Sequence, residues 1–337
     1  MVNIKDIAKA AGVGVSTVSR VLNNQPDVKA STKEKVLKVI EELNYVPNNS
    51  ARNLKRIKSN NIGIYVIGEY SSFFSAVIEN IEKQISKHGY SIVLHFNHNQ
   101  EKHLESAVQF SLEKRLVGLI YLGGEVNKLD EGYIKQFKIP VVFASSMIDR
   151  QVNKDLFSSV NINDQDASYK AVSYLLDLNH REIALISAGD DHKSVSKARH
   201  DAYIKALDER SISYNSDYIS WGNYSMQSGY KAMNTLLERN LPITAVFAVA
   251  DLMAIGAYKA ICDKGLKVPE DISIIGFDGL EITKFINPTL ATIEQPANEM
   301  GNKIVEVLIS GLKEVTNVFH IVLDTKLIKG HSCKLIK

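Results

Sequence analysis

Residues 4–22 read IKDIAKAAGVGVSTVSRVL and hold two short segments of helical periodicity on either side of a glycine-bearing turn. In the first segment Ile4, Ile7, Ala8 and Ala11 lie on one helical face, because they occupy positions i, i+3, i+4 and i+7. Asn3 precedes this segment, and an asparagine side chain in that place can cap the first backbone amides of a helix. The stretch therefore predicts two helices joined by a tight turn.

The second segment has an apolar inner face and a short, mostly polar outer edge. Val18, Val21 and Leu22 form the inner face. The outer edge consists of Val15, Ser16, Thr17, Ser19 and Arg20. Two packed helices, the second displaying small hydroxyls and an arginine, form the helix-turn-helix that enters the DNA major groove. A small helical hairpin that merely packs on another surface has the same pattern, so the hairpin alone leaves both interpretations open.

The residues just downstream favour the DNA-binding interpretation. Residues 31–34, STKE, match a capping box and predict a third helix with Val36, Ile40 and Leu43 on its core face. Residues 48–56, NNSARNLKR, form a basic segment long enough for two helical turns. So short a helix is marginal in water, and we expect it to form only against a partner.

The order IKDIAKAAGVGVSTVSRVLN…VKASTKEKVLKVIEELNYVPNNSARNLK resembles the LacI/GalR family of bacterial repressors across the whole head-piece. The resemblance implies that Arg20 pairs with guanine in the major groove, and that Leu54 wedges between base steps in the minor groove. For Thr17 and Ser19, plain helix solubility is an equal alternative to phosphate contacts. The full set of DNA-binding candidates is Asn3, Ile4, Val15, Ser16, Thr17, Ser19, Arg20, Asn23, Thr32, Tyr45, Asn48, Leu54 and Lys55.

The charge of the chain is unevenly distributed. The 337 residues carry a net charge of +2, but residues 1–60 hold 11 basic and 5 acidic side chains, and the remainder holds 29 and 33. A basic head on a mildly acidic body indicates a polyanionic partner at one end only. Because the N-terminus lacks an apolar signal region and no apolar run reaches membrane-spanning length, we expect a cytoplasmic, nucleoid-associated protein with no membrane partner.

The two cysteines and the histidines give no sign of a metal or cofactor. Cys262 and Cys333 are far apart and have no metal-ligand spacing, which is typical of a reduced cytoplasmic protein. His95, His98 and His103 lack a carboxylate or thiol at ligand spacing. We therefore expect no metal and no cofactor. The sequence also contains no nucleophile, base and acid set that would define an enzyme.

After residue 60 the pattern changes to strands alternating with helices, in two successive series. Such alternation predicts parallel sheets with helices on both faces, and two series predict two Rossmann-like lobes. The first series comprises 62–67, 73–87, 91–96, 101–113, 118–122 and 141–144. The second series starts near residue 160 and comprises 164–178, 182–187, 196–210, 226–239, 244–249, 252–264 and 272–277.

Local runs of the body also resemble the LacI/GalR family, whose body is similar to periplasmic sugar-binding proteins. These runs include NHREI at 179–183, DLMAIG at 251–256, IGFD at 275–278 and TIEQP at 292–296. The predicted fold is an all-α helix-turn-helix head-piece plus an α/β body of two periplasmic-binding-protein-like lobes. The predicted domains are a head at 1–46, a hinge at 47–60 and an effector-binding and dimerisation body at 61–337. Lobe 1 takes 61–160 and 294–317, lobe 2 takes 161–293 and 318–337, and strand 319–323 goes with lobe 2.

A cleft that binds a polyhydroxyl ligand needs convergent donors and acceptors beside an apolar platform. Asp278 can accept hydroxyls, Arg199 can donate to them and Trp221 can stack on a pyranose ring. Simpler roles stay open: Asp278 as a turn residue, Arg199 as a surface charge, Trp221 as a core or lobe-surface residue and Asp251 as a structural carboxylate. The effector-binding candidates that the resemblance implies are Phe73, Phe74, Ser145, Arg199, Trp221, Asp251, Asp278 and Gln295.

Together these features predict a homodimeric, sequence-specific DNA-binding repressor of a carbohydrate-utilisation operon. Its partners would be double-stranded operator DNA and a small effector, a sugar or sugar phosphate, bound between the lobes. Two regulators of the same fold are alternatives, one responding to a purine and one to a phosphoprotein. A solute-binding protein or an enzyme on Rossmann-like lobes is the alternative from another class, but neither explains the basic head.

Overall fold

The computed structural model describes residues 4–22, 25, 28–43, 59–68, 71–98, 102–189, 195–314 and 317–337. Residue contacts divide the chain into two compact units, a head at 1–59 and a body at 60–337. The predicted hinge at 47–60 lies almost entirely outside the described residues, so its helix stays a prediction. No described helix combines the length and the apolar character needed to cross a membrane.

The head consists of three helices around a small apolar core: α1 (Ile4–Ala11), α2 (Val15–Leu22) and α3 (Ala30–Glu42). Buried side chains from all three helices meet in this core: Ile7, Ala8, Ala11, Val18, Val21 and Val36. Gly12 adopts a φ of +63°, which lets the chain reverse between α1 and α2 at no side-chain cost. The predicted helix-turn-helix is thus confirmed, and α2 begins and ends at the predicted residues.

The predicted start of the third helix is wrong. α3 begins at Ala30 with Lys29 at its N-cap position, so Ser31 lies inside the first turn instead of capping it. The predicted core face is also only partly right, because Val36 is fully buried whereas Leu43 is 39% exposed at the helix end. A side chain that lies beyond the last packed turn has no core to enter.

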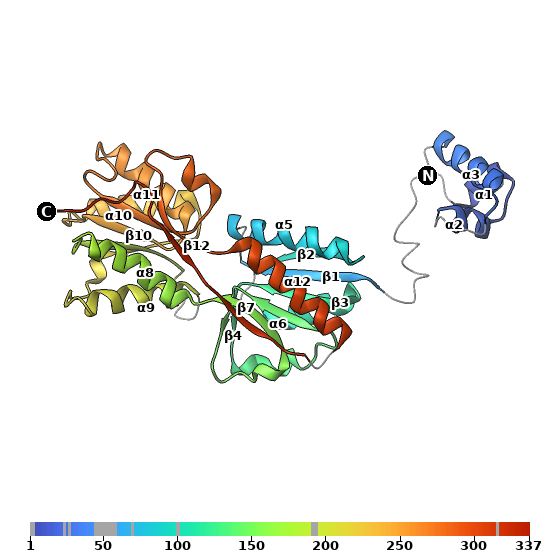
Figure 1. The fold of residues 1–337 in the computed structure, drawn as a ribbon, viewed down its shortest axis with the longest axis horizontal. Helices are drawn as coiled ribbons and strands as arrows, with labels where there is room; N and C mark the ends of the chain where they lie inside the picture. Colours follow the sequence, from blue (N-terminus) through green and yellow to red (C-terminus); the bar gives the residue numbers. More distant parts are fainter. Residues whose placement is uncertain are drawn as a thin grey trace. The chain divides into compact units, whose positions relative to one another are not determined.

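The first lobe of the body is a six-stranded, wholly parallel sheet in the order β13-β7-β5-β3-β1-β2. Helices α5 and α12 cover one face of the sheet, and α6 packs on the other (Figure 1). The elements of this lobe are β1 (Asn61–Ile67), α5 (Ser72–Lys87), β2 (Ser91–Asn97), α6 (His103–Glu113), β3 (Leu116–Leu122), β4 (Glu125–Val126), α7 (Glu131–Ile134), β5 (Val141–Ala144), β6 (Met147–Ile148), β7 (Ser158–Ile162), α12 (Ala297–Lys313) and β13 (His320–Leu323).

The second lobe is a six-stranded sheet in the order β14-β12-β11-β10-β8-β9, parallel except for β14. Helices α8 and α9 pack together on one face, and α10 and α11 pack together on the other (Figure 1). Its elements are α8 (Asp164–Asp177), β8 (Ile183–Ala188), α9 (Val195–Asp208), β9 (Ile219–Gly222), α10 (Met226–Glu238), β10 (Ala245–Ala248), α11 (Asp251–Asp263), β11 (Ser273–Asp278), β12 (Ala291–Glu294) and β14 (Lys326–Ile328). The short strand β9 is absent from the elements expected from the sequence.

The chain passes between the two sheets three times: from β7 into α8, from β12 into α12, and from β13 to β14. The placement of strand 319–323 in the second lobe is wrong, because β13 pairs in parallel with β7 of the first sheet. Leaving the first-lobe helix α12, the chain meets the open edge of β7 first, where the Ser159 amide donates to the Phe319 carbonyl at 2.8 Å. Only β14 then joins the second sheet.

Candidate functional site

The head presents the predicted DNA-reading edge to solvent. Val15, Ser16 and Arg20 are exposed along α2, whereas Thr17 and Ser19 are partly buried. Val18 and Val21 hold the opposite face of α2 against the core. Ile4 begins α1, and Thr32 lies partly buried in the first turn of α3. The remaining head candidates lie outside the described residues: Asn3, Asn23, Tyr45, Asn48, Leu54 and Lys55.

Four of the body candidates lie at or near the carboxyl ends of strands, where open α/β sheets bind ligands. Asp278 is the last residue of β11, and Gln295 follows β12 directly. Ser145 follows β5, and Trp221 lies near the end of β9. Ser145 and Asp278 have φ angles of +49° and +124°, which is uncommon for residues other than glycine. Such strain tends to persist where the surrounding structure holds a side chain for function.

Three of the eight body candidates meet in one buried cluster. Gln295 is 4% exposed, and its Nε2 donates to Asp278 Oδ1 at 2.8 Å. Arg199 is 4% exposed, and its guanidinium carbon lies 3.7 Å from the ring centroid of Phe277, which precedes Asp278 in β11. The cluster joins α9, β11 and the segment after β12, which is one of the crossings between lobes.

Asp164 is a member of this cluster that the sequence reasoning missed. Arg199 Nε donates to Asp164 Oδ1 at 2.9 Å, and Nη2 lies 2.8 Å from the same oxygen. Arg199 Nη1 donates to the Val249 carbonyl at 2.6 Å. Asp164 begins α8 directly after the first-lobe strand β7, so it stands at another crossing between lobes. Its position just after a strand end is the sequence signal that marks Asp164 as a candidate for the site.

Burial controls the charge of this cluster. It raises the pKa of Asp278 to about 6, although the Arg199 guanidinium and the Gln295 amide lower that pKa. Burial also raises the pKa of Asp164, against the opposing effect of Arg199. A buried carboxylate such as Asp278, whose pKa is shifted well away from its usual value, is a candidate for a binding role, since its charge responds to a ligand.

The other body candidates have clear but different surroundings. Phe73 is buried in the first-lobe core, and its ring centroid lies 5.9 Å from that of the half-buried Phe74. Trp221 is 48% exposed and makes an edge-to-face contact with His200 at 5.7 Å between ring centroids. Its exposure excludes a core position for Trp221, whereas a place on the lobe surface and a place where the indole stacks on a ligand both fit it.

Asp251 is an internal structural carboxylate. It is fully buried, and its two oxygens accept hydrogen bonds from Thr292 Oγ1 at 2.6 Å and from the Leu280 amide at 2.7 Å. Burial raises its pKa well above the usual value, and the nearby charge of Asp278 raises it further. Asp251 therefore ties α11 to the loop after β11 and to β12, and both of its oxygens are occupied by protein groups.

Replacing Asp251 with alanine is expected to lower the free energy of unfolding of the body by about 2–4 kcal/mol, because the Leu280 amide would lose its acceptor and the Thr292 hydroxyl its shortest hydrogen bond. Urea unfolding followed by circular dichroism measures this loss. Asp263→Ala is the matched control on the same helix, since the side chain of Asp263 is exposed and paired only at the surface with Lys259 and Tyr230. Equal stability of the Asp251→Ala and wild-type proteins would contradict the structural role.

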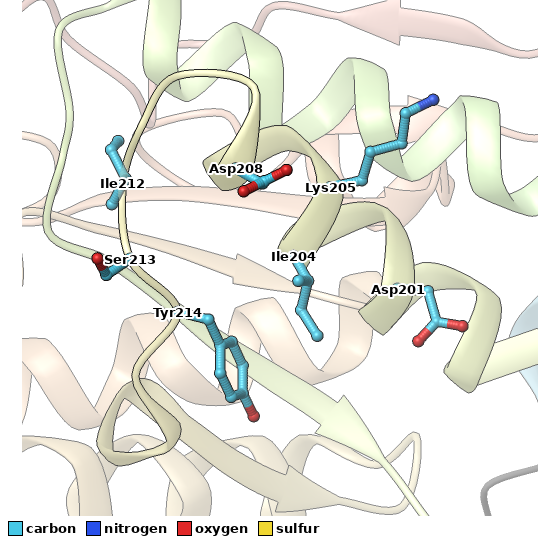
Figure 2. A pocket seen from close by; sticks show the side chains of 7 residues that line it. All are labelled: Asp201, Ile204, Lys205, Asp208, Ile212, Ser213 and Tyr214. Atoms are coloured by element: carbon cyan, nitrogen blue, oxygen red, sulfur yellow. The ribbon is translucent and has the colours of Figure 1, made fainter.

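A separate hollow of about 440 Å³ lies on the outer face of α9 (Figure 2). Ile204 and Tyr214 supply its apolar side chains, with Asp201, Lys205 and Asp208 at its rim. These helix residues face away from the buried side of α9 that carries Arg199. The hollow is thus distinct from the cluster of candidate ligand-binding residues. Among the described residues, no group of three or more His, Cys, Asp or Glu side chains is placed to hold a metal.

A helix-turn-helix head joined to a two-lobed ligand-binding body defines a ligand-responsive DNA-binding regulator. The model for "Bacterial regulatory proteins, lacI family" matches residues 3–48, and the model for "Periplasmic binding protein-like domain" matches residues 172–333. The HTH-type transcriptional regulator MalR of Clostridium butyricum is 43% identical over 332 residues, which cover 98% of this chain and 99% of MalR. The chain belongs to the LacI family of bacterial transcriptional regulators, and it is a regulator and not an enzyme.

Solved structures of transcriptional regulators resemble the structure of this chain over nearly its whole length. The lac repressor dimer bound to operator and the anti-inducer ONPF has a TM-score of 0.75 at 28% identity, covering 99% of each chain. The complex of the transcriptional regulator CelR with cellobiose has a TM-score of 0.72 at 25% identity, covering 98% of this chain and 100% of CelR.

Proposed function

We propose that this chain is a homodimeric repressor of genes for carbohydrate use, and that a small sugar bound between the lobes changes its affinity for operator DNA. The observation that carries the proposal is the buried cluster of Arg199, Asp278 and Gln295 at a crossing between lobes. A carboxylate and a guanidinium at one place can accept from and donate to neighbouring hydroxyls of a sugar. The similarity to MalR and to the CelR–cellobiose complex supports a sugar effector.

The reading of DNA would follow from the head. The exposed Arg20 can bond guanine O6 and N7, Ser16 can bond several bases and Val15 can contact a thymine methyl group. A dimer would place two α2 helices on the half-sites of a pseudo-palindromic operator, as the similarity to the operator-bound lac repressor dimer supports. Such a regulator would work in the bacterial cytoplasm, where the operator is.

A gel-shift assay with candidate operator DNA and with random duplex, each at two salt concentrations, tests the DNA-binding half of the proposal. We expect a strong preference for operator and a steep loss of binding to both duplexes with salt, because phosphate contacts release counterions. A thermal-shift screen of neutral sugars tests the effector half. Equal affinity for operator and random duplex, with every sugar present or absent, would end the proposal.

A purine is the second candidate effector. Its ring N–H groups and exocyclic oxygen could also be bound by the Asp278 carboxylate and the Arg199 guanidinium, which lie close together in the cluster. Hypoxanthine and guanine therefore belong in the thermal-shift screen. A shift with either base and with no sugar would replace the carbohydrate assignment but leave the regulator intact.

Effector affinity is expected to fall about fourfold between pH 7.5 and pH 5.5, because the fraction of ionised Asp278 falls by that factor when its pKa is about 6. The sign follows from the role of the carboxylate: hydroxyl groups donate to the ionised form, and protonation below pH 6 removes that form. Isothermal titration of the effector across this range measures the change.

A variant can move the midpoint of this pH dependence. Gln295→Met removes an amide that donates to Asp278 and lowers its pKa, so the midpoint should move to higher pH. An affinity that is flat or that rises as the pH falls would show that the ionised Asp278 does not hold the effector.

A further inference from the structure

Arg199 is the cationic member of the buried cluster, and its donors are largely used inside the protein. Nε and Nη2 reach the same oxygen of Asp164, at 2.9 and 2.8 Å, and Nη1 donates to the Val249 carbonyl at 2.6 Å. The guanidinium plane also lies against the ring of Phe277. A guanidinium has five N–H groups, so at most two remain for a ligand. Two such donors can bond hydroxyl oxygens of a ligand. The positive charge of Arg199 is already paired with Asp164.

The charged side chains that act on Arg199 in the described part of the chain are acidic. Asp164 forms the ion pair, Asp278 lies near enough to raise the Arg199 pKa, and Asp251 is electrostatically coupled to Asp278. The guanidinium therefore lies beside two acidic side chains, Asp164 and Asp278, and the buried carboxyl of Asp251, whose pKa is raised well above its usual value, lies on the far side of Asp278. The remaining effector-binding candidates of this chain are all uncharged: Phe73, Phe74, Ser145, Trp221 and Gln295.

A phosphate or carboxylate group would meet an unfavourable field in this cluster. Proteins bind such anions with guanidinium groups that offer a free fork of donors, and Asp164 already occupies the Nε and Nη2 fork of Arg199. An anionic ligand would either displace Asp164, leaving that carboxylate unpaired beside Asp278, or bind the two remaining donors of a guanidinium whose charge Asp164 already pairs. A neutral polyol neither breaks the Asp164–Arg199 pair nor meets charge repulsion, because its hydroxyls can both donate to Asp278 and accept from Arg199.

We propose that Asp164, by neutralising Arg199, makes this cleft select uncharged polyhydroxyl ligands and reject their phosphorylated or carboxylated counterparts. This inference rests on the proposed function, since it concerns the effector of the same cleft. It narrows the effector to a free sugar, excluding sugar phosphates and sugar acids. Asp164 acts as a positioning residue: it sets the charge and orientation of the guanidinium that the ligand contacts. Selectivity of this kind comes from an unfavourable charge contact with the wrong ligand.

The wild-type full-length protein provides the first test. Isothermal titration at constant ionic strength compares matched pairs: glucose with glucose 6-phosphate, maltose with maltose 6′-phosphate, ribose with ribose 5-phosphate, and galactose with galacturonate. For every pair in which a member binds, we expect the neutral member to bind at least about 100-fold more tightly. An anionic member that binds as tightly as its neutral partner overturns this inference and leaves the proposed function standing. If neither class of sugar binds, the sugar effector of the proposed function fails, and this inference fails with it.

Asp164→Asn provides the second test, because it keeps the side-chain shape and releases the charge of Arg199. Relative to the wild-type protein, the anionic member of each pair should gain about tenfold in affinity over its neutral partner. Asp166→Asn is the matched control, since Asp166 lies in the same first turn of α8 but is half exposed and paired with Lys170 at 2.7 Å. That control should keep the wild-type selectivity.

A double variant separates charge from structure. Asp164→Asn combined with Arg199→Gln removes both charges, so the gain in anion binding must disappear. A merely structural role for Asp164 would lower the affinity for both members of a pair alike and would create no gain. If folded Asp164→Asn protein shows the wild-type selectivity, the inference is overturned. If that variant does not fold, the wild-type pairs decide alone.

Discussion

Replacing Asp278 with asparagine is expected to weaken effector binding at least about 100-fold, because an amide cannot give the charge-assisted acceptance of two hydroxyl groups that a carboxylate gives. The substitution keeps the side-chain shape, and the Gln295 amide can still donate to the remaining oxygen. The affinity of the ligand-free protein for operator should stay unchanged, since the head folds on its own core. Isothermal titration and a gel-shift assay measure the two quantities.

The matched control for this experiment is Asp263→Asn. It also removes one carboxylate from the second lobe, but at an exposed site on α11 where the side chain pairs with Lys259. The control protein should keep the wild-type effector affinity. If the Asp278→Asn protein responds to the same sugar at the same concentration as the wild type, the assignment of the ligand site is wrong.

Replacing Leu54 with alanine is expected to weaken operator binding by well over tenfold and to leave effector binding unchanged. The prediction comes from the resemblance of the head-piece, in which this leucine would unstack a base step in the minor groove. Without the wedge, the bend that brings further contacts is no longer favoured. Leu54 lies outside the described residues, so the experiment also tests whether the predicted hinge at 47–60 contacts DNA at all. Gel-shift titration with operator and with random duplex measures both affinities.

Ile57→Ala is the control for Leu54→Ala, because it truncates another aliphatic side chain three residues further on. We expect the Leu54 variant to lose its preference for operator, with little change on random duplex, and the Ile57 variant to lose much less. Operator affinity equal to wild type in the Leu54→Ala protein would exclude the wedge.

The head was predictable from sequence because its periodicity is local. Val18 and Val21 point into the core as their spacing predicts, and α2 has the predicted bounds. The start of α3 was not predictable from the capping box alone. STKE fits the motif with Ser31 as the N-cap, but the N-cap is Lys29, so the helix begins two residues earlier and places Ser31 inside the first turn. Helix ends depend on the backbone of the preceding residue, which a motif does not fix.

The body was predictable in its alternation of strands and helices but not in its crossings. The assignment of residues 319–323 to the second lobe failed, because pairing with β7 is a tertiary choice between two open sheet edges. Strand β9 was missed because it is a four-residue edge strand in which Ile219 is the only buried apolar residue, so it gives no apolar run. Such edges carry the weakest sequence signal in an α/β protein.

The cluster of candidate ligand-binding residues was also predictable only where its members stand in local sequence patterns. Arg199, Asp278 and Gln295 were found from local runs and do contact one another or a shared neighbour. Asp164 was missed because its partner lies 35 residues away, on a helix that packs beside α8 only in the fold. Asp251 was chosen from the same kind of run, and the structure gives both of its oxygens to internal partners. Sequence spacing finds which residue types could bind, and packing decides which of them face a ligand.

The central claim is that a sugar in the body and an operator on the head affect each other's binding. The most direct test measures the operator Kd with and without saturating effector, and the effector Kd with and without saturating operator, in one buffer. Linkage requires the two ratios to be equal, and we expect a ratio of about 5 to 150. An operator Kd that stays the same when the effector is saturating would contradict the claim.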